Sequence, residues 1–278
     1  MAMQLDHRLF LEQDYAIVNP MQVDGSVLEA IPSIVVGERR FACERDQLPR
    51  LVVLGDLTRE DRFALLDTAD ALLADSGVPL FSALVRSDES ARTFAALAGD
   101  NLLLRHPLRG AFYFRFFDPR VFVHLARLLS AAQLSRIVAP ARSWLWFDPW
   151  AVRWREFVAS VCGAEADAGP SALDDRQWDA LSRIEVVNRA LLQWQSEARG
   201  EPTPSVVEAI DASVREAVDG LGLTETDDLV AYALNERRHG SGFHDTRAAR
   251  EALERVRRRE ASYAAATREL AEPATAAG

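Results

Sequence analysis

The sequence predicts an α/β N-terminal domain, with a mixed or parallel sheet flanked by helices, followed by an all-α C-terminal domain. In the first part of the chain, short apolar runs alternate with helical patterns that have clear capping residues. Beyond residue 170 the apolar spacing is helical throughout. The segment 162–170 is small and polar, as is typical of a linker. We therefore expect domains over residues 1–161 and 171–278.

The strands of the first domain are predicted from apolar runs bounded by Gly, Pro or Asn, and its helices from caps. Thr58 with Asp61 three residues later is similar to a capping box, and Gly77 ends that helix. In order, we expect strands at 15–18, 34–36 and 51–54, a helix from Thr58, a strand within 79–85, a helix from 87 or 88 to 99, a strand at 112–117, helices near 119–129 and 131–138, and a strand at 142–147.

An aromatic run, Phe112 to Phe117, is the most distinctive stretch of the chain. Five of its six residues are aromatic, and only Arg115 interrupts them. A strand would place alternate residues on opposite faces, and both faces would be bulky and mostly apolar. Such a pattern is typical of a central strand that is covered on both sides.

This strand is expected to stop at Asp118 and to turn directly into a helix. Asp is a good N-cap, and Pro119 suits the first helical position. Arg115 lies among aromatic residues, and Arg120 lies in the first helical turn, where the dipole disfavours a cation. Because Asp118 is the obvious partner of both arginines, we expect a buried Arg–Asp pair to fix this corner.

Helical periodicity and caps predict four helices in the second domain. A stripe from Trp178 to Trp194 follows three–four spacing, and Ser205 to Glu208 forms a capping box. The expected helices run from 178 to Gly200, from 205 to 220, from a Thr224 cap to 240, and from about 245 to 270.

The last of these helices has a narrow apolar seam. Its members, Ala249, Leu253, Val256, Glu260, Tyr263, Thr267 and Leu270, follow a strict four–three spacing that Glu260 and Thr267 interrupt. We also expect ion pairs Glu251–Arg255 and Glu254–Arg258. The seam could dock on its own helical bundle, which we favour, or on another protein.

Composition excludes several classes of protein. The net charge of −10 argues against a general nucleic-acid binder, and all 32 basic residues are arginine. No apolar stretch reaches the roughly 18 residues of a membrane span, and residues 1–10 are not a secretory signal. Cys43 and Cys162 have no metal-ligand spacing. We expect a cytoplasmic protein without a membrane partner; an acidic surface would also suit a basic partner.

Motifs for catalysis or metal binding are weak. The sequence has no phosphate-binding glycine loop and no nucleophile elbow, and we expect no cofactor. His239, His244 and Asp245 could bind a metal, but the intervening glycines indicate a turn and Asp245 is a natural cap. His124, one turn after Arg120, could form an acid–base set with Asp118, although no nucleophile accompanies it.

The octapeptide from Phe114 to Val121, Phe-Arg-Phe-Phe-Asp-Pro-Arg-Val, resembles the signature of the type VI secretion effector adaptor (Tap/TEC-type) chaperones. The similarity covers 111–148 and continues through Leu125, Leu128, Leu129, Ala132-Gln133-Leu134, Ala139-Pro140 and Trp144 to Phe147. Upstream, Tyr15 to Val18 is similar to the family's opening strand, and Gly-Phe-His at 242–244 is similar to a turn in its helical tails. The chain departs from the family at 91–97, which has no histidine.

The resemblance implies an adaptor that binds a toxic effector and helps to load it onto the VgrG spike, by surfaces and not by catalysis. Interfaces of this kind depend on a few aromatic or arginine anchors. The candidate anchors are Trp144, Trp146, Trp150, Arg153 and Trp154. Tryptophan is highly buried on average, so we expect at least half of the four tryptophans to be core residues.

Two other classes remain open. An enzyme could use Arg115, Asp118, Arg120 and His124 as a polar site at the end of a strand. An immunity-type inhibitor would also be acidic and without catalytic residues. The gene neighbourhood separates the adaptor from both, because an adaptor gene should lie between a spike gene and a toxin gene.

Overall fold

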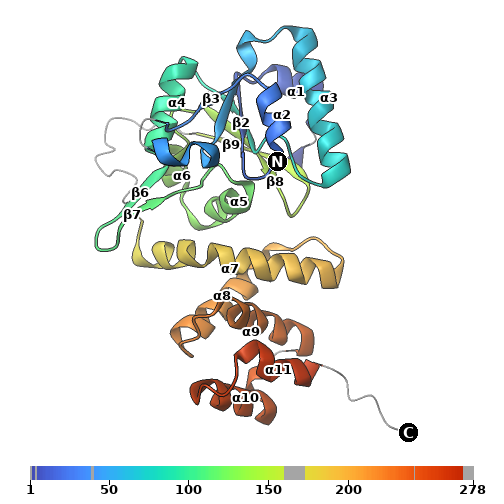
Figure 1. Cartoon of the computed structure of the whole chain (residues 1–278), viewed down its shortest axis with the longest axis vertical. Helices are drawn as coiled ribbons and strands as arrows, with labels where there is room; N and C mark the ends of the chain where they lie inside the picture. Colours follow the sequence, from blue (N-terminus) through green and yellow to red (C-terminus); the bar gives the residue numbers. More distant parts are fainter. Residues whose placement is uncertain (1, 4, 39–40, 160–172, 241, 272–278) are drawn as a thin grey trace. The chain divides into compact units, whose positions relative to one another are not determined.

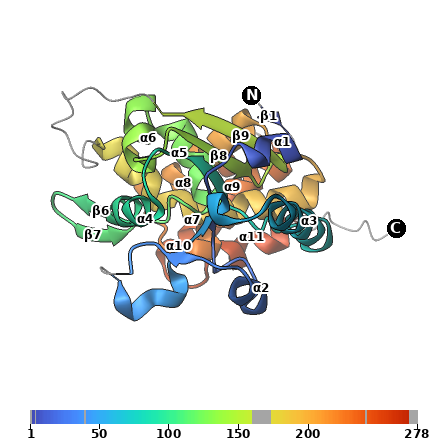
Figure 2. The same ribbon diagram turned by 90° about the horizontal axis from the view of Figure 1, so that it is seen from above.

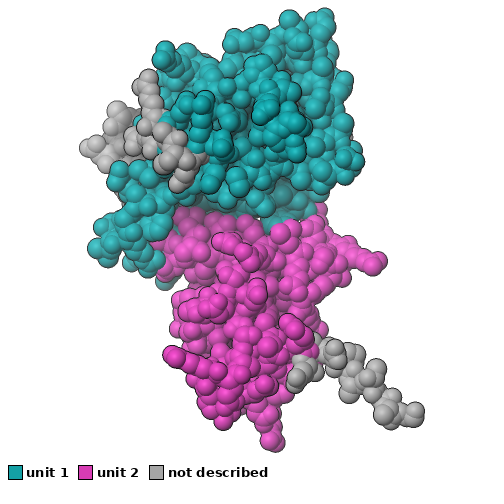
Figure 3. Space-filling view, in the orientation of Figure 1, with its two compact units in different colours: residues 1–177 teal, residues 178–278 magenta. Residues whose placement is uncertain are grey.

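The structure is a computed structural model that describes residues 2–3, 5–38, 41–159, 173–240 and 242–271. The chain divides into two compact units, residues 1–177 and 178–278 (Figure 3). No helix in the described ranges is long and apolar enough to cross a membrane. The predicted linker, 162–170, lies outside the described residues, so the division into independent domains at that segment stays a prediction.

The N-terminal unit is a sheet flanked by helices, as predicted (Figure 1). Its strands are β1 (Ala2–Met3), β2 (Tyr15–Val18), β3 (Ile34–Val35), β4 (Arg50–Val53), β5 (Ala83–Arg86), β6 (Leu103–His106), β7 (Gly110–Tyr113), β8 (Ser143–Asp148) and β9 (Arg153–Val158). Its helices are α1 (His7–Leu11), α2 (Gly25–Ala30), α3 (Arg59–Ser76), α4 (Ala91–Asp100), α5 (Pro119–Leu128) and α6 (Ala131–Val138), with 3-10 turns η1 (Ala42–Gln47) and η2 (Leu54–Asp56).

The main sheet has seven strands in the order β1-β9-β8-β5-β2-β4-β3 and is antiparallel at every junction. This differs from the expected mixed or parallel pairing. β4 and β5 do run in the same direction and are joined by α3, but β2 lies between them and runs the opposite way. A strand–helix–strand alternation in the sequence therefore does not make these strands neighbours in the sheet.

Each face of the sheet buries a different set of side chains. On one face, a core cluster joins Val18, Leu84 and Leu145 to Phe10 of α1 and Leu66 of α3. The opposite face packs on α4 and α5, and the tryptophans of β8 lie there. Figures 1 and 2 show α1 and α3 on one side of the sheet and α4, α5 and α6 on the other.

The aromatic run does not form a central strand, which corrects the prediction for 112–117. β7 ends at Tyr113 and pairs only with β6, in a separate two-stranded hairpin. Phe112 is 44% exposed, whereas Phe114, Phe116 and Phe117 are buried in the turn that follows. The aromatic side chains are buried because they pack in a corner, and strand pairing is not required for that burial.

The C-terminal unit is helical, as predicted. It contains most of α7 (Asp175–Ala198), then α8 (Pro204–Asp219), α9 (Thr226–His239), η3 (Phe243–Asp245), α10 (Arg247–Arg257) and α11 (Tyr263–Ala271). α8 begins after Thr203, which caps Val206 N with Pro204 at the first position, and not at Ser205. α9 begins after Glu225, one residue beyond the predicted Thr224 cap.

The predicted helix over 245–270 is broken into two, which is the largest correction in this unit. α10 ends at Arg257, and Arg259 has a left-handed φ of +58°. The chain then turns back, and Tyr263 of α11 is buried with Tyr232 in the core of the same unit. The seam therefore packs largely within its own bundle. The ion pairs also differ: Glu251 pairs with Arg247, and Glu254 pairs with Arg257.

Candidate functional site

The corner between β7 and α5 contains the residues that the sequence singled out. Phe114 N donates to Leu102 O at 2.8 Å, and Asp118 N donates to Arg115 O at 2.9 Å, which closes a turn. Asp118 is then the N-cap of α5, with Pro119 at the start of the helix. Both of these predicted roles are confirmed.

The Asp118 carboxylate is the centre of this corner. It is 2% exposed and accepts four hydrogen bonds. Oδ1 accepts from Arg120 N at 3.0 Å and Arg120 Nε at 3.2 Å. Oδ2 accepts from Arg115 Nη2 at 2.8 Å and Arg120 Nη2 at 3.0 Å. The expected pairing with both arginines is confirmed.

This arrangement is suited to binding and not to proton transfer. A general base needs a carboxylate oxygen within reach of a substrate proton, but both Asp118 oxygens are occupied by donors. His124 is 2% exposed and lies inside the fold. The Arg115 and Arg120 side chains are 37% and 40% exposed, so part of each guanidinium faces outward. The corner can present donors to a carboxylate of a partner.

The four candidate tryptophan anchors are core residues. Trp144, Trp146, Trp150 and Trp154 are 2%, 5%, 5% and 6% exposed. The ring of Phe122, on α5, lies 5.8 Å from that of Trp144 and 5.3 Å from that of Trp146. Because strand β8 is covered on both faces, its alternating side chains are all buried. These tryptophans cannot be surface anchors in this conformation, and of the five candidates only Arg153 is partly exposed.

A second buried carboxylate that accepts several hydrogen bonds, Asp148, was not identified from the sequence. Asp148, 4% exposed, accepts from Trp150 N at 3.0 Å, from Ala151 N at 3.2 Å and from Arg155 Nε at 2.6 Å. It holds the turn between β8 and β9. Its signal was an Asp-Pro pair after an aromatic strand, the same pattern as at 118–119. The partner, Arg155, could not be assigned because β9 was not predicted.

The histidines of the 239–245 loop do not converge on a metal site. His239 stacks on Phe243, whereas His244 stacks on Tyr232 with ring centroids 3.7 Å apart and planes at 4°. Asp245 binds Arg250, and the cap of the next helix is Thr246 and not Asp245. Among the described residues, no group of three His, Cys, Asp or Glu side chains could hold a metal ion.

His244, which is half-buried, instead packs against the buried Tyr232 and Tyr263 of the helical unit. Its Nδ1 lies 3.1 Å from the Tyr263 hydroxyl, and its buried Nε2 has no hydrogen-bond partner among the described residues. Burial lowers the pKa of His244, and Glu236, Glu216 and Asp245 only partly oppose this effect. Burial also raises the pKa of Tyr263 to about 12, so this hydroxyl stays protonated at neutral pH.

A polar cavity of about 300 Å³ lies at the ends of β5 and β8. Its lining is Asp14, Arg86, Ser87, Asp88, Arg142, Ser143 and Val158. The charges in it are paired: Arg86 with Glu156 at 2.7 Å, Arg142 with Asp88, and Asp14 with Ser87 N. No carboxylate or hydroxyl in this lining is arranged as an activated nucleophile with a base.

The residues of the family resemblance beyond the corner have structural roles. Gln133 completes a capping box with Ser130 at the start of α6. The Ala139–Pro140 peptide bond is cis, and Asn101 Nδ2 donates to three backbone carbonyls in the adjoining segment, those of Arg136, Ile137 and Ala139.

Comparisons with protein-family models, with curated proteins and with solved structures gave no match for this chain.

Proposed function

We propose that this protein is a cytoplasmic, non-catalytic adaptor that binds a type VI secretion effector and helps to load it onto the VgrG spike. The proposal starts from the similarity of Phe114 to Val121 to the adaptor signature. The observation that supports it best is the state of Asp118. Its carboxylate is used entirely as a cap and as a partner of Arg115 and Arg120, which fits a structural signature better than an acid–base residue.

The proposed binding surface differs from the tryptophan set, because those side chains are buried. The β6–β7 hairpin offers exposed apolar side chains: Leu108 is 91% exposed and Phe112 is 44% exposed. Partly exposed arginines of the corner, Arg115 and Arg120, add charged donors. Exposed apolar residues together with arginine are typical of interface anchors.

Co-expression with the proteins encoded beside this gene tests the proposal. We expect a stoichiometric complex with the neighbouring effector, and binding of the spike protein, in size-exclusion chromatography and pull-down. Leu108→Glu should weaken the complex. Met21→Glu is the matched control, because Met21 is also exposed, at 57%, but lies outside the hairpin. Equal binding by both variants would remove the hairpin from the surface.

The other classes give different results in the same experiment. An enzyme would bind neither neighbour and would turn over a small molecule, and Asp118→Asn would abolish that activity with the fold intact. An immunity-type inhibitor would bind the toxin and block its activity without binding the spike. Either result would replace the adaptor proposal.

A further inference from the structure

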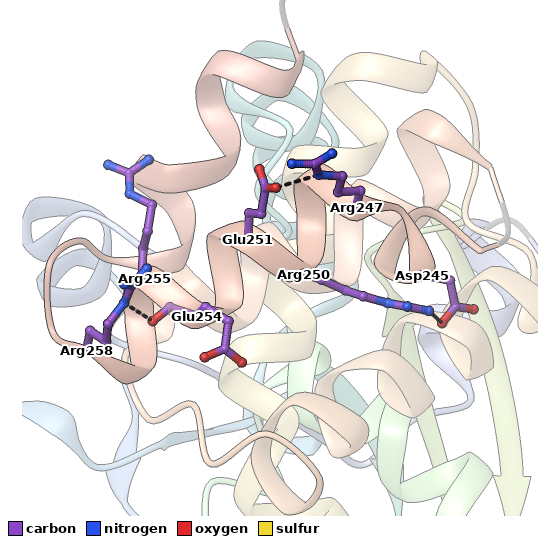
Figure 4. A pocket seen from close by; sticks show the side chains of 7 residues that line it. All are labelled: Asp245, Arg247, Arg250, Glu251, Glu254, Arg255 and Arg258. Carbon is purple, nitrogen blue, oxygen red and sulfur yellow. Dashed lines mark hydrogen bonds and ion pairs between the residues drawn. The ribbon is translucent and has the colours of Figure 1, made fainter.

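An open groove of about 720 Å³ lies along α10 in the helical unit (Figure 4). Its lining is almost entirely charged: Arg247, Arg250, Arg255 and Arg258, with Asp245, Glu251 and Glu254 between them. A groove that is lined only by Asp, Glu and Arg side chains does not suit a drug-like or lipid ligand, which would need contact with apolar side chains. It suits a ligand that is recognised by charge.

The segment 247–259, which includes α10, has a net charge opposite in sign to that of the whole chain. Residues 247–259 contain six arginines and two glutamates, a net charge of +4, whereas the whole chain has a net charge of −10. The helix dipole favours cations in the last turn of α10, which accounts for Arg255 and Arg257. It does not account for Arg259, which lies beyond the helix end.

The ion pairs within the groove are weak, and one arginine has none. Arg247–Glu251 and Arg250–Asp245 are 2.7 and 3.2 Å long, but their side chains are 62–92% exposed, so solvent screens them. Among the described residues, Arg255 has no carboxylate partner, and its side chain extends away from the acidic residues (Figure 4). Arg258 pairs with Glu260 at 3.2 Å, but these side chains are 63% and 49% exposed, so solvent screens this pair as well. The groove therefore keeps guanidinium donors for an incoming carboxylate.

The backbone at Arg259, the residue after the groove-lining Arg258, gives a second indication. Arg259 N donates to Val256 O at 2.8 Å, and Glu260 N donates to Arg255 O at 2.9 Å. This is the hydrogen-bond pattern of a Schellman motif, whose left-handed position is usually glycine. A side chain at φ +58° is strained there. An arginine held at a position that favours glycine indicates a use for its guanidinium.

We propose that the α10 groove binds an acidic segment of a protein partner, through Arg255 and Arg258, which line it, and through Arg259, which follows them in the chain just outside the lining. Guanidinium groups bind carboxylates in a bidentate geometry, and arginine clusters recognise acidic motifs in this way. This proposal identifies the chemistry of a partner of the adaptor, and it therefore rests on the proposed function. Binding of a synthetic acidic peptide can be measured without an effector or a spike protein, so the two proposals can fail separately.

A protein segment fits the groove better than a nucleic acid does. Continuous phosphate binding requires a basic surface with few carboxylates, and the domain as a whole should be basic. Here Asp245, Glu251 and Glu254 alternate with the arginines, and the net charge of the chain opposes a polyanion. Only a short segment with a few carboxylates avoids this repulsion.

The test measures binding of fluorescein-labelled deca-glutamate to the full-length protein by fluorescence anisotropy at low salt. We expect Arg255→Glu and Arg258→Glu each to weaken binding by at least about tenfold. Arg189→Glu is the matched control: it changes the net charge equally, in an exposed pair with Glu185 on α7 of the same unit. This control should bind like the wild type, and circular dichroism should show all variants folded.

Three results would overturn the proposal. The first is no binding of the peptide by the wild type, or equal affinity in Arg255→Glu and Arg189→Glu. The second is tighter binding of an oligonucleotide of the same charge, lost in Arg255→Glu, which would make the groove a nucleic-acid site. The third is self-association of the wild type that Arg255→Glu abolishes, which would make a second copy of the chain the occupant.

Discussion

At the residue scale, Asp118 combines two stabilising roles in one carboxylate. It caps α5 through Arg120 N and pairs with the guanidiniums of both Arg115 and Arg120. Replacing an N-cap by alanine costs about 1 kcal/mol, and the ion pairs add a screened contribution because both arginines are more than a third exposed. Asp118→Ala should therefore lower the free energy of unfolding by about 1–3 kcal/mol in urea titrations.

Asp118→Ser is the control for this prediction. Serine keeps a capping oxygen but removes the charge, so this variant should lose less stability than Asp118→Ala, and the difference reports the ion pairs. An unchanged denaturation midpoint in Asp118→Ala would contradict both assigned roles.

The sequence was sufficient to predict the contacts of Asp118 at this corner, but it was not sufficient to predict which candidate interface residues are exposed. Asp-Pro after an apolar run has a local physical meaning, so the cap and both arginine partners were predictable. The burial of Trp150 and Trp154 depends on β9 and on the layers that cover it, which are tertiary features. Composition can identify an interface residue type, but it cannot distinguish an exposed tryptophan from a buried one.

His244 should make the stability of the helical unit dependent on pH. Burial lowers its pKa in the folded state, while the unfolded state protonates near the ordinary value of about 6.5. As the pH falls below that value, the unfolded state binds more protons than the folded state. The free energy of unfolding should therefore be highest at neutral pH and should decrease as the pH falls from about 6.5.

Urea titrations at neutral and at mildly acidic pH test this dependence. His244→Gln should reduce the stability difference between the two conditions. His239→Gln serves as the control, because His239 is an exposed histidine on α9 of the same unit. An equal loss of stability on acidification in wild type and His244→Gln would exclude His244 as its source.

At the element scale, local caps were predictable and helix interruptions were not. Thr58 and Ser130 cap α3 and α6, and Gly77 ends α3 with a left-handed φ of +71°. The break after α10 has no glycine or proline, so helical periodicity continued through it. The break instead follows from the burial of Tyr263, which requires the chain to reverse. Tertiary packing overrode local propensity at this point.

Arg259 provides a test of this account of the break. Arg259→Gly removes the left-handed strain and should raise the free energy of unfolding of the helical unit by up to about 1 kcal/mol. Arg257→Gly, at the last residue of α10, should instead lower it, because glycine is a poor helix former and the ion pair with Glu254 is lost. Thermal unfolding followed by circular dichroism measures both. A loss of stability in Arg259→Gly would mean that the arginine side chain stabilises the turn.

The packing of α5 on the sheet gives a further prediction. Phe122 is 1% exposed between Trp144 and Trp146, so Phe122→Ala should lower the free energy of unfolding by about 3–5 kcal/mol. Ala126→Ser, on the exposed side of the same helix, should change it by less than about 0.5 kcal/mol. Urea denaturation compares the two. Similar midpoints would mean that α5 does not stabilise the sheet through this aromatic contact.

At the scale of the whole molecule, the alternation of strands and helices predicted the layers correctly and the pairing incorrectly. Helices on both faces follow from the amphipathic spacing, but the position of β2 between β4 and β5 is set by pairing across more than 30 residues. Non-local pairing of this kind has no local signal in one sequence. The antiparallel pairing of the strands therefore could not be derived from the sequence, although the presence of helices on the faces of the sheet could.

The helical unit should fold without the α/β unit, because it contains its own core. Ala217, Leu229, Tyr232 and Tyr263 form a buried cluster within this unit, and Arg183 of α7 pairs with Asp211 of α8 at 3.2 Å. A fragment of 173–278 should therefore unfold cooperatively on heating, with native helix content by circular dichroism.

Limited proteolysis of the full chain gives the complementary measurement, with the first cleavage expected within 163–169, where the sequence is small and polar. Recovery of an intact C-terminal fragment that retains its cooperative transition would establish two independent domains. A gradual, non-cooperative transition in the 173–278 fragment, with first cleavage inside α7 or α8, would instead mean that the helical unit needs the rest of the chain to fold. The same fragment can then be tested with the deca-glutamate probe, because a unit that folds alone should retain the α10 groove.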